Sequence, residues 1–255
     1  MKTEQKRTWL TGAHLKWIAI VTMAIDHGAA VLLEPILLNT PVSSDNYEWL
    51  QNVNRIYMIL RYIGRFAFPV FCFLLVEGFW HTRSKAKYLR NLMIFALVSE
   101  VPFDLALYGK MCSWQHQNVF FTLAAGFGAI WIAEYFTYKA IRDSLNVMLY
   151  RALSAASVVG IALLAEFIHT DYGAAGVATI FVLYAMRSRP VVSALAAWLI
   201  LGLTNLLEFY CFPFIGAVYF YNGERGRQNK YFFYMFYPVH LLILAILKIF
   251  IFKGI

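Results

Sequence analysis

The sequence predicts an all-helical bundle that crosses a membrane about nine times. Of its 255 residues, 61% are hydrophobic and only 14% are charged, whereas a soluble domain is about 45–50% apolar and about a quarter charged. The apolar residues come in runs of about 20, the length of a membrane-spanning helix. A transmembrane barrel would instead show alternating segments of about 10 residues. The composition therefore excludes a soluble globular domain, a disordered chain and a small secreted scaffold.

Nine apolar runs lie between polar breaks, and each is predicted to form one span. We place them at roughly 15–34, 56–80, 89–108, 118–138, 150–168, 172–187, 191–207, 209–222 and 231–252. Little sequence is left outside these runs, so residues 1–255 are predicted to form a single transmembrane domain. The first run is long enough to span and lacks a small-residue cleavage site, so no cleavable signal peptide is expected.

Basic residues alternate between the connections in a way that predicts the orientation. With nine spans, 16 of the 22 basic residues fall on one side. The other side has an acidic loop at 35–54 and short turns with Lys110, Asp171 and Glu208. Because basic residues collect in cytoplasmic loops, we expect a multi-pass protein of a bacterial-type cytoplasmic membrane with its N-terminus inside. The basic side is made up of Lys2, Lys6, Arg7, Lys16, Arg83, Lys85, Lys87, Arg90, Lys139, Arg142, Arg151, Arg187, Arg189, Arg225, Arg227 and Lys230.

The net charge of +8 would raise nucleic acid as a partner in a soluble protein. Here the basic cytoplasmic loops account for it, so we expect a lipid bilayer and no nucleic acid as partner. The three cysteines are too few and too scattered for a disulfide framework or a metal cluster. The six histidines show no close-paired metal spacing, so no metal is expected.

Ionisable residues inside the spans are the candidates for function, because each costs several kcal/mol at the bilayer centre. At about 1.5 Å per residue, His27 and Glu100 lie about 18 Å from the cytoplasmic end of their spans. Arg65 lies about 13 Å from the outer end and His240 about 14 Å from the inner end. The spacing therefore predicts one polar layer near the midplane. The full set is Asp26, His27, Arg61, Arg65, Glu100, Asp104 and His240.

These residues have structural as well as chemical interpretations. An ion pair between Arg61 or Arg65 and an acidic residue of the third span would fix helix packing or serve a reaction. A deep histidine beside a carboxylate, as in Asp26-His27, has the makings of a general base with an orienting group. Neighbouring helical residues point about 100° apart, however, so Asp26 is also able to serve another partner. His240 is either a functional group or a satisfied core histidine.

A series of short motifs, in order along roughly residues 12–245, resembles the TraX family of membrane proteins. Each motif is weak alone, and their number and order carry the resemblance. They are Leu15-Lys16 through Asp26-His27, Gly64-Arg65-Phe66-Ala67-Phe68-Pro69-Val70-Phe71, Glu77-Gly78-Phe79, His81-Thr82-Arg83, Ser99-Glu100-Val101-Pro102-Phe103-Asp104, Asn118-Val119-Phe120-Phe121-Thr122-Leu123, Asp171-Tyr172-Gly173, Gly176-Val177, Tyr221-Asn222-Gly223 and Tyr234-Met235-Phe236-Tyr237-Pro238-Val239-His240-Leu241.

The resemblance implies an activity. TraX proteins are known for N-terminal acetylation of conjugative pilin, and they are similar to a wider group of membrane acyltransferases that use cytoplasmic acyl-CoA. In that group a basic residue and a histidine of the first span are separated by ten residues. Lys16 and His27 have this spacing, with lysine where arginine is usual, and lysine lacks the fork that grips a phosphate at two points.

The resulting hypothesis is an integral membrane acyltransferase that takes acetyl from cytoplasmic acetyl-CoA, or another acyl-CoA. Cations at the cytoplasmic face would bind the donor's phosphates. His27 would act as base or nucleophile, and Arg65 or a nearby donor would stabilise the oxyanion. Asp26, or Glu100 through Arg65, would set the tautomer and basicity of His27. The residues predicted to bind the donor are Lys16, Arg83, Arg225 and Arg227.

The acceptor side is less determined by the sequence. The acceptor is predicted to be an amine or hydroxyl of a protein N-terminus or a cell-envelope molecule, and its identity is unknown. We assign Arg61, Asp104 and His240 to substrate binding. The outer loop 35–54, with Tyr47 and Trp49, is predicted to form part of the acceptor entrance.

Two other functions are compatible with the same residues. Midplane Asp, Glu, Arg and His side chains are equally natural in a proton-coupled transporter or flippase. A non-catalytic scaffold of a surface or conjugation apparatus would need His27 and Arg65 for folding alone. Coenzyme A binding, and the effect of His27→Ala on acyl transfer, separate these alternatives.

Overall fold

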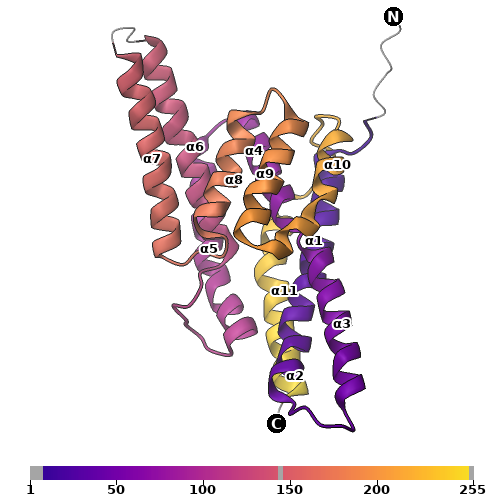
Figure 1. The fold of residues 1–255 in the computed structure, drawn as a ribbon. Coiled ribbons are helices and arrows are strands. Elements are labelled where there is room, and N and C mark those ends of the chain that lie inside the picture. Colours follow the sequence, from indigo (N-terminus) through magenta and orange to yellow (C-terminus); the bar gives the residue numbers. More distant parts are fainter. Residues whose placement is uncertain (1–7, 143–145, 253–255) are drawn as a thin grey trace, which may run out of the picture. The chain divides into compact units, whose positions relative to one another are not determined.

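The computed structural model describes residues 8–142 and 146–252, and the basic residues Lys2, Lys6 and Arg7 fall outside these ranges. Within them the regular structure is helical and no β-sheet forms (Figure 1). Two isolated β-bridges join Leu10 to Tyr221 and Gln117 to Thr170. The predicted all-helical fold is therefore confirmed.

Each of the nine predicted apolar runs corresponds to one helical stretch of the described chain, and the second stretch is divided into two helices. Six segments are long and apolar enough to cross a membrane, and three apolar helices are shorter. The long segments are Gly12–Asn39, Tyr47–His81, Lys85–Tyr108, Val119–Arg142, Val147–Phe167 and Tyr231–Ile251. The shorter ones are Gly173–Ala185, Pro190–Thr204 and Leu206–Tyr219.

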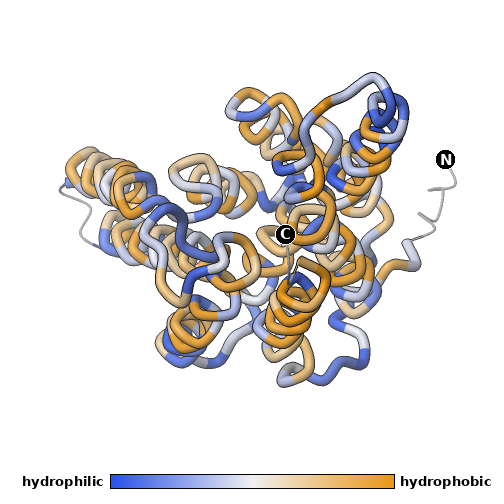
Figure 2. The backbone as a smooth tube through the Cα atoms, turned by 90° about the horizontal axis from the view of Figure 1, so that it is seen from below, coloured by the Kyte–Doolittle hydropathy of each residue, from blue (hydrophilic) through white to orange (hydrophobic). Residues whose placement is uncertain are grey.

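Hydrophobic residues line the helices and hydrophilic residues concentrate in the connections (Figure 2). Many large apolar side chains face outward, as on α7 (Val147–Phe167), where Leu163, Leu164 and Phe167 are more than half exposed. Such surface is unfavourable in water and favourable against lipid tails. The chain is thus a multi-pass membrane protein.

The helices form two compact units, and α4 and α5 each contribute residues to both. The first unit comprises residues 8–71, 101–112 and 205–252. Its elements are α1 (Gly12–Gly28), a π-helical turn η1 (Ala29–Leu33), α2 (Glu34–Asn39), α3 (Tyr47–Gly64), the first turn of α4 (Ala67–His81), the end of α5 (Lys85–Tyr108), a 3₁₀ helix η2 (Leu206–Cys211), α10 (Pro213–Tyr219) and α11 (Lys230–Ile251).

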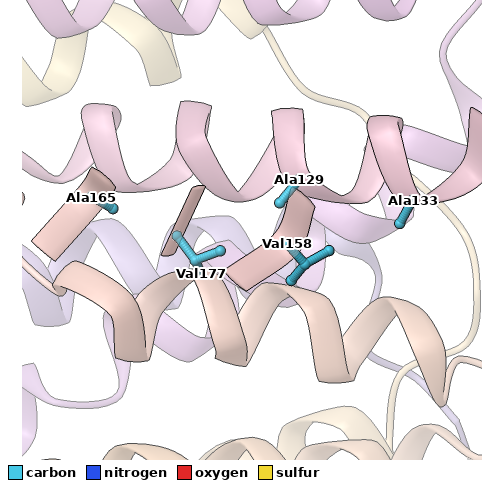
Figure 3. Close-up of a cluster of buried hydrophobic side chains, with 5 residues drawn as sticks. All are labelled: Ala129, Ala133, Val158, Ala165 and Val177. Atoms are coloured by element: carbon cyan, nitrogen blue, oxygen red, sulfur yellow. The ribbon is translucent and has the colours of Figure 1, made fainter. Parts of the chain in front are cut away.

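The second unit comprises residues 72–100, 113–142 and 146–204. It contains most of α4 and α5 together with α6 (Val119–Arg142), α7, α8 (Gly173–Ala185) and α9 (Pro190–Thr204). Small side chains allow α6, α7 and α8 to approach closely (Figure 3). This buried cluster consists of Ala129, Ala133, Val158, Ala165 and Val177. The single transmembrane domain predicted over residues 1–255 stays a prediction.

The second predicted span differs from the observed helix pair. We predicted one span at 56–80 preceded by a loop at 35–54, whereas α3 begins at Tyr47 and the segment outside helices is 40–46. Tyr47 and Trp49 therefore lie in the first turn of α3, and the predicted loop is corrected. The segment also breaks at Arg65 and Phe66. Pro69 explains the break, because a proline ring clashes with the carbonyl four residues earlier and gives it no hydrogen bond.

The first and last spans of the chain run parallel within the first unit. Near the starts of both helices, the ring centroid of Trp17 in α1 lies 5.2 Å from that of Phe232 and 5.4 Å from that of Phe233 in α11. Further along both helices, His27 contacts His240. Parallel first and last spans agree with an odd number of crossings, as the nine-span prediction requires.

Candidate active site

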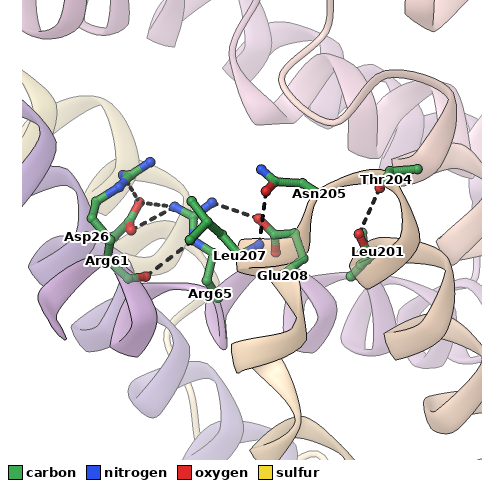
Figure 4. Close-up of polar contacts among 8 residues, drawn as sticks. All are labelled: Asp26, Arg61, Arg65, Leu201, Thr204, Asn205, Leu207 and Glu208. Atoms are coloured by element: carbon green, nitrogen blue, oxygen red, sulfur yellow. Dashed lines mark hydrogen bonds and ion pairs between the residues drawn. The ribbon is translucent and has the colours of Figure 1, made fainter. Parts of the chain in front are cut away.

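Asp26 is the centre of a buried ion cluster in the first unit (Figure 4). Its carboxylate accepts hydrogen bonds from Arg61 Nη1 at 2.7 Å and from Arg65 Nη2 at 2.7 and 2.8 Å. Arg65 Nη1 donates to Glu208 Oε1, also at 2.7 Å. The side chain of Glu208 is 3% exposed and that of Arg65 is 11% exposed. Two cations thus neutralise two anions, which is how charges are accommodated inside a membrane protein.

The local fold determines which side chains reach Asp26. Arg61 and Arg65 are four residues apart at the end of α3, so they share one face. Arg65 lies at the break before α4, and its Nε donates to the carbonyl of Arg61 at 3.3 Å. Three of the five N–H groups of Arg65 are therefore committed through Nε, Nη1 and Nη2 to groups of this unit.

Gly64 allows α1 and α3 to approach at this point. A Cβ at position 64 would lie 2.2 Å from Asp26 Cβ and 2.3 Å from its Oδ1. We expect Gly64→Ala to destabilise the protein by about 1–3 kcal/mol through overpacking, measured as a lower unfolding temperature in detergent. Gly28→Ala is the matched control, because a Cβ at position 28 meets nothing within 4 Å. Equal effects of both substitutions would contradict the close approach.

Sequence reasoning missed Glu208, which we predicted in a short outer turn. The structure corrects this, since Glu208 is 3% exposed and paired with Arg65. Asn205 starts η2 by accepting a hydrogen bond from the Leu207 backbone N–H at 3.0 Å, and this turn presents the carboxylate. The available signal was a lone acidic residue in the otherwise apolar stretch 206–221.

Next to Asp26, His27 forms a pair with His240. Nδ1 of His27 lies 2.7 Å from Nε2 of His240, and the two ring planes are within 10° of parallel. Nδ1 of His240 lies 2.8 Å from the carbonyl oxygen of Phe236. The ring plane of Tyr237 is inclined at 73° to that of His27 and at 68° to that of His240. A π-helical turn begins at Ala29, two residues after His27. Such turns are frequent at functional sites.

A basic pocket lies at the beginning of α1 and α11. Lys16 Nζ donates to Gln228 Oε1 at 2.6 Å and lies 5.4 Å from the centre of the Phe233 ring. The neighbouring open pocket has a volume of about 700 Å³. It is lined by Arg225, Arg227, Gln228, Asn229 and Tyr231. Three of the four residues predicted to bind the donor, Lys16, Arg225 and Arg227, thus lie at or beside this pocket, and their role in donor binding stays a prediction.

Backbone hydrogen bonds attach this loop to the start of α1. The Leu10 N–H donates to the Phe220 carbonyl at 3.1 Å, and the Gly12 N–H donates to the Glu224 carbonyl at 2.8 Å. Gly226 has φ of +69°, and a Cβ there would lie 2.6 Å from Thr11 Oγ1. The pocket is thus held against α1 by the main chain.

Lys16 and His27 lie on one face of α1. Eleven residues at about 100° each leave them only about 20° apart around the helix, and about 16 Å apart along it. Ile20 and Met23, both buried, lie between them on that face. The basic pocket and the histidine pair are therefore at two positions along one helix face.

The remaining predicted residues have other surroundings. Glu100, in the second unit, accepts hydrogen bonds from the Asn118 side-chain amide and from the Asn118 backbone N–H at 3.3 Å, just before α6 begins. Asp104 is fully buried in the part of α5 that belongs to the first unit. Arg83 is an exposed residue of the α4–α5 connection. The catalytic role of Glu100, the substrate role of Asp104 and the donor role of Arg83 stay predictions.

These features define a polytopic helical membrane protein with a buried ion cluster, a histidine pair and a basic pocket. The family model described as "TraX protein" matches residues 11–248. The chain belongs to the TraX family. It is similar to the "Probable fimbrial assembly protein FimC, serogroup H1" of Dichelobacter nodosus, with 30% identity over 265 residues that cover 93% of this chain and 95% of that protein. No solved structure matches the chain.

Proposed function

We propose that this protein is a membrane acyltransferase that transfers acetyl from acetyl-CoA to an amine or hydroxyl acceptor. The observation that supports this best is the arrangement on α1, where one helix face carries Lys16 at a basic pocket and His27 in a histidine pair. The first feature suits an anionic donor. The second suits proton transfer at a site shielded from water.

The basic pocket fits the phosphate groups of coenzyme A. Arg225 and Arg227 line it, and Lys16 lies beside it through Gln228. Guanidinium and ammonium groups make strong charge-assisted hydrogen bonds to phosphate oxygens. The thioester arm would then run along the apolar face of α1, past Ile20 and Met23, toward His27. This path spans about 16 Å, at about 1.5 Å per residue.

The reaction at His27 follows from the chemistry of a thioester. The acceptor amine or hydroxyl attacks the thioester carbonyl carbon while the imidazole of His27 takes its proton. The tetrahedral intermediate then collapses, the carbon–sulfur bond breaks, and the coenzyme A sulfur leaves with the proton that His27 returns. The products are the acetylated acceptor and coenzyme A. A covalent acetyl-histidine is the alternative course, and both courses require His27.

The two arginines differ in their capacity to stabilise the oxyanion. Arg65 donates to Asp26, Glu208 and the Arg61 carbonyl, so we assign it the role of holding the cluster together. Arg61 gives one described hydrogen bond, to Asp26, and its side chain is 22% exposed against 11% for Arg65. Arg61 is therefore our candidate for the group that stabilises the negative oxygen of the intermediate.

For the acceptor, we propose the N-terminal amine of a fimbrial subunit. The similar Dichelobacter nodosus protein is named as a probable fimbrial assembly protein, and TraX proteins are known for N-terminal acetylation of conjugative pilin. A terminal amine is a competent nucleophile once deprotonated. Because it lies at the free end of the fimbrial subunit, it is the part of that polypeptide best able to reach a site between membrane helices.

Acetyl-CoA binding tests the proposal. Acetyl-CoA at about 100 times its dissociation constant should stabilise the purified protein by about 2.7 kcal/mol, seen as a higher unfolding temperature in detergent. Arg225→Ala should weaken binding about tenfold or more, since a hydrogen bond to a charged group contributes about 1.5–3 kcal/mol. Arg55→Ala is the control, because Arg55 is exposed on α3 and does not line the pocket.

A folded protein that no acyl-CoA stabilises would contradict the proposal. The buried Asp26, Arg65 and Glu208 cluster would then favour a proton-coupled transporter, whose activity would be tested as proton flux in vesicles.

A further inference from the structure

We infer that His240 is a positioning residue that fixes the tautomer of His27, leaving Nε2 of His27 as the nitrogen that accepts the acceptor's proton. This inference deepens the proposed function and rests on it. It assigns His240 a role other than the substrate contact predicted from the sequence. It also names the atom at which the proton is transferred.

The first step concerns the Phe236 carbonyl. Nδ1 of His240 lies 2.8 Å from this oxygen, and a carbonyl oxygen only accepts hydrogen bonds. Nδ1 of His240 must therefore carry a proton and donate it. Both groups lie on α11, one turn apart, so the helix itself maintains this bond.

The second step concerns the charge of His240. The residue is 8% exposed, and the two partners described for its ring nitrogens are a carbonyl and another imidazole. Burying a charged group without a countercharge is costly, so His240 is neutral. A neutral imidazole has one N–H and one lone pair, so Nε2 of His240 is an acceptor.

The third step concerns His27. Its Nδ1 lies 2.7 Å from Nε2 of His240, and ring centroids 5.0 Å apart with planes within 10° of parallel fit an end-to-end N–H···N bond. Because Nε2 of His240 accepts, Nδ1 of His27 donates. Neutral His27 then has its lone pair on Nε2. Both ring nitrogens of His240 are engaged, by His27 and by the Phe236 carbonyl, so the Nε2 lone pair of His27 is the basic site that the pair offers to a reactant.

Asp26 is not the group that orients His27. Its two carboxylate oxygens accept from Arg61 and Arg65, and it points about 100° away from His27 around α1. The orienting role that the sequence left open between Asp26 and Glu100 thus passes to His240. The chain of hydrogen bonds that fixes the tautomer thus connects the Phe236 carbonyl to His240 and His240 to His27.

Nitrogen NMR of the full-length protein tests the tautomer directly. The protein would be labelled with ¹⁵N in its histidine rings, and the His27 signals would be identified by their loss in His27→Gln. We expect His27 in the Nδ1–H form in the native protein. In His240→Leu we expect a shift to the Nε2–H form, which is the commoner one in free histidine. His27 in the Nε2–H form in the native protein would overturn the inference.

A second variant separates positioning from packing. His240→Gln keeps a side-chain oxygen able to accept from Nδ1 of His27, whereas His240→Leu does not. We expect the glutamine variant to retain the Nδ1–H form of His27 and at least tenfold more acetyl transfer than the leucine variant. Equal tautomers in both folded variants would overturn the inference. If the tautomer is as stated and the native protein transfers no acetyl group, the proposed function fails and the assignment of the nitrogen stands.

Discussion

We expect His27→Ala to lower acetyl transfer by about 10²–10⁴-fold, the usual contribution of a general base. The substitution removes the imidazole that lies 2.7 Å from His240 and leaves the basic pocket around Arg225 intact. Acetyl-CoA binding should therefore be nearly unchanged. The measurement is the initial rate of labelled acetyl transfer, alongside the thermal shift given by acetyl-CoA.

His116→Ala is the matched control, since it removes an exposed loop histidine of the second unit. It should transfer at the native rate. If the His27→Ala protein is folded, binds acetyl-CoA and transfers acetyl at the native rate, then His27 takes no part in the reaction.

The second large effect is expected from Asp26→Asn. Removing one partner of a buried ion pair typically costs about 3–5 kcal/mol, because the other charge is left uncompensated. Here Arg61 and Arg65 would face Glu208 as the single remaining carboxylate of the cluster. We expect a large drop in the unfolding temperature of the detergent-solubilised protein.

The control for this substitution is Asp45→Asn, which makes the same chemical change at an exposed residue between α2 and α3. It should alter stability by no more than about 0.5 kcal/mol. An Asp26→Asn protein as stable as Asp45→Asn would mean that the cluster contributes little to the fold.

The long helices and the ionisable residues inside them were predictable from the sequence, because run length and charge in an apolar run are local signals. The pairing of α1 with α11 was not predictable. The spacing of residues along a span gives the depth of a side chain in the membrane, but it does not show which other helix that side chain contacts. His27 and His240 were both predicted near the midplane, yet only the parallel packing of the two helices brings their nitrogens together.

Two features were missed for a common reason, which is that backbone breaks lie inside apolar runs. Pro69 interrupts the second span at Arg65, and a 3₁₀ helix carries Glu208 into the cluster. Neither feature is visible in a hydropathy pattern, because both lie within residues that are apolar overall. The Gly64 and Pro69 pair and the isolated acidic residue in 206–221 were the signals that mattered.

The most direct test of the account uses membrane vesicles from cells that produce the protein, since these contain the native acceptors. Acetyl-CoA labelled in its acetyl group would be added, and labelled acceptors would be identified by mass spectrometry. We predict an acetylated fimbrial-subunit N-terminus in vesicles with the native protein and its absence in vesicles with His27→Ala. Equal labelling in both, with equal amounts of folded protein, would contradict the account.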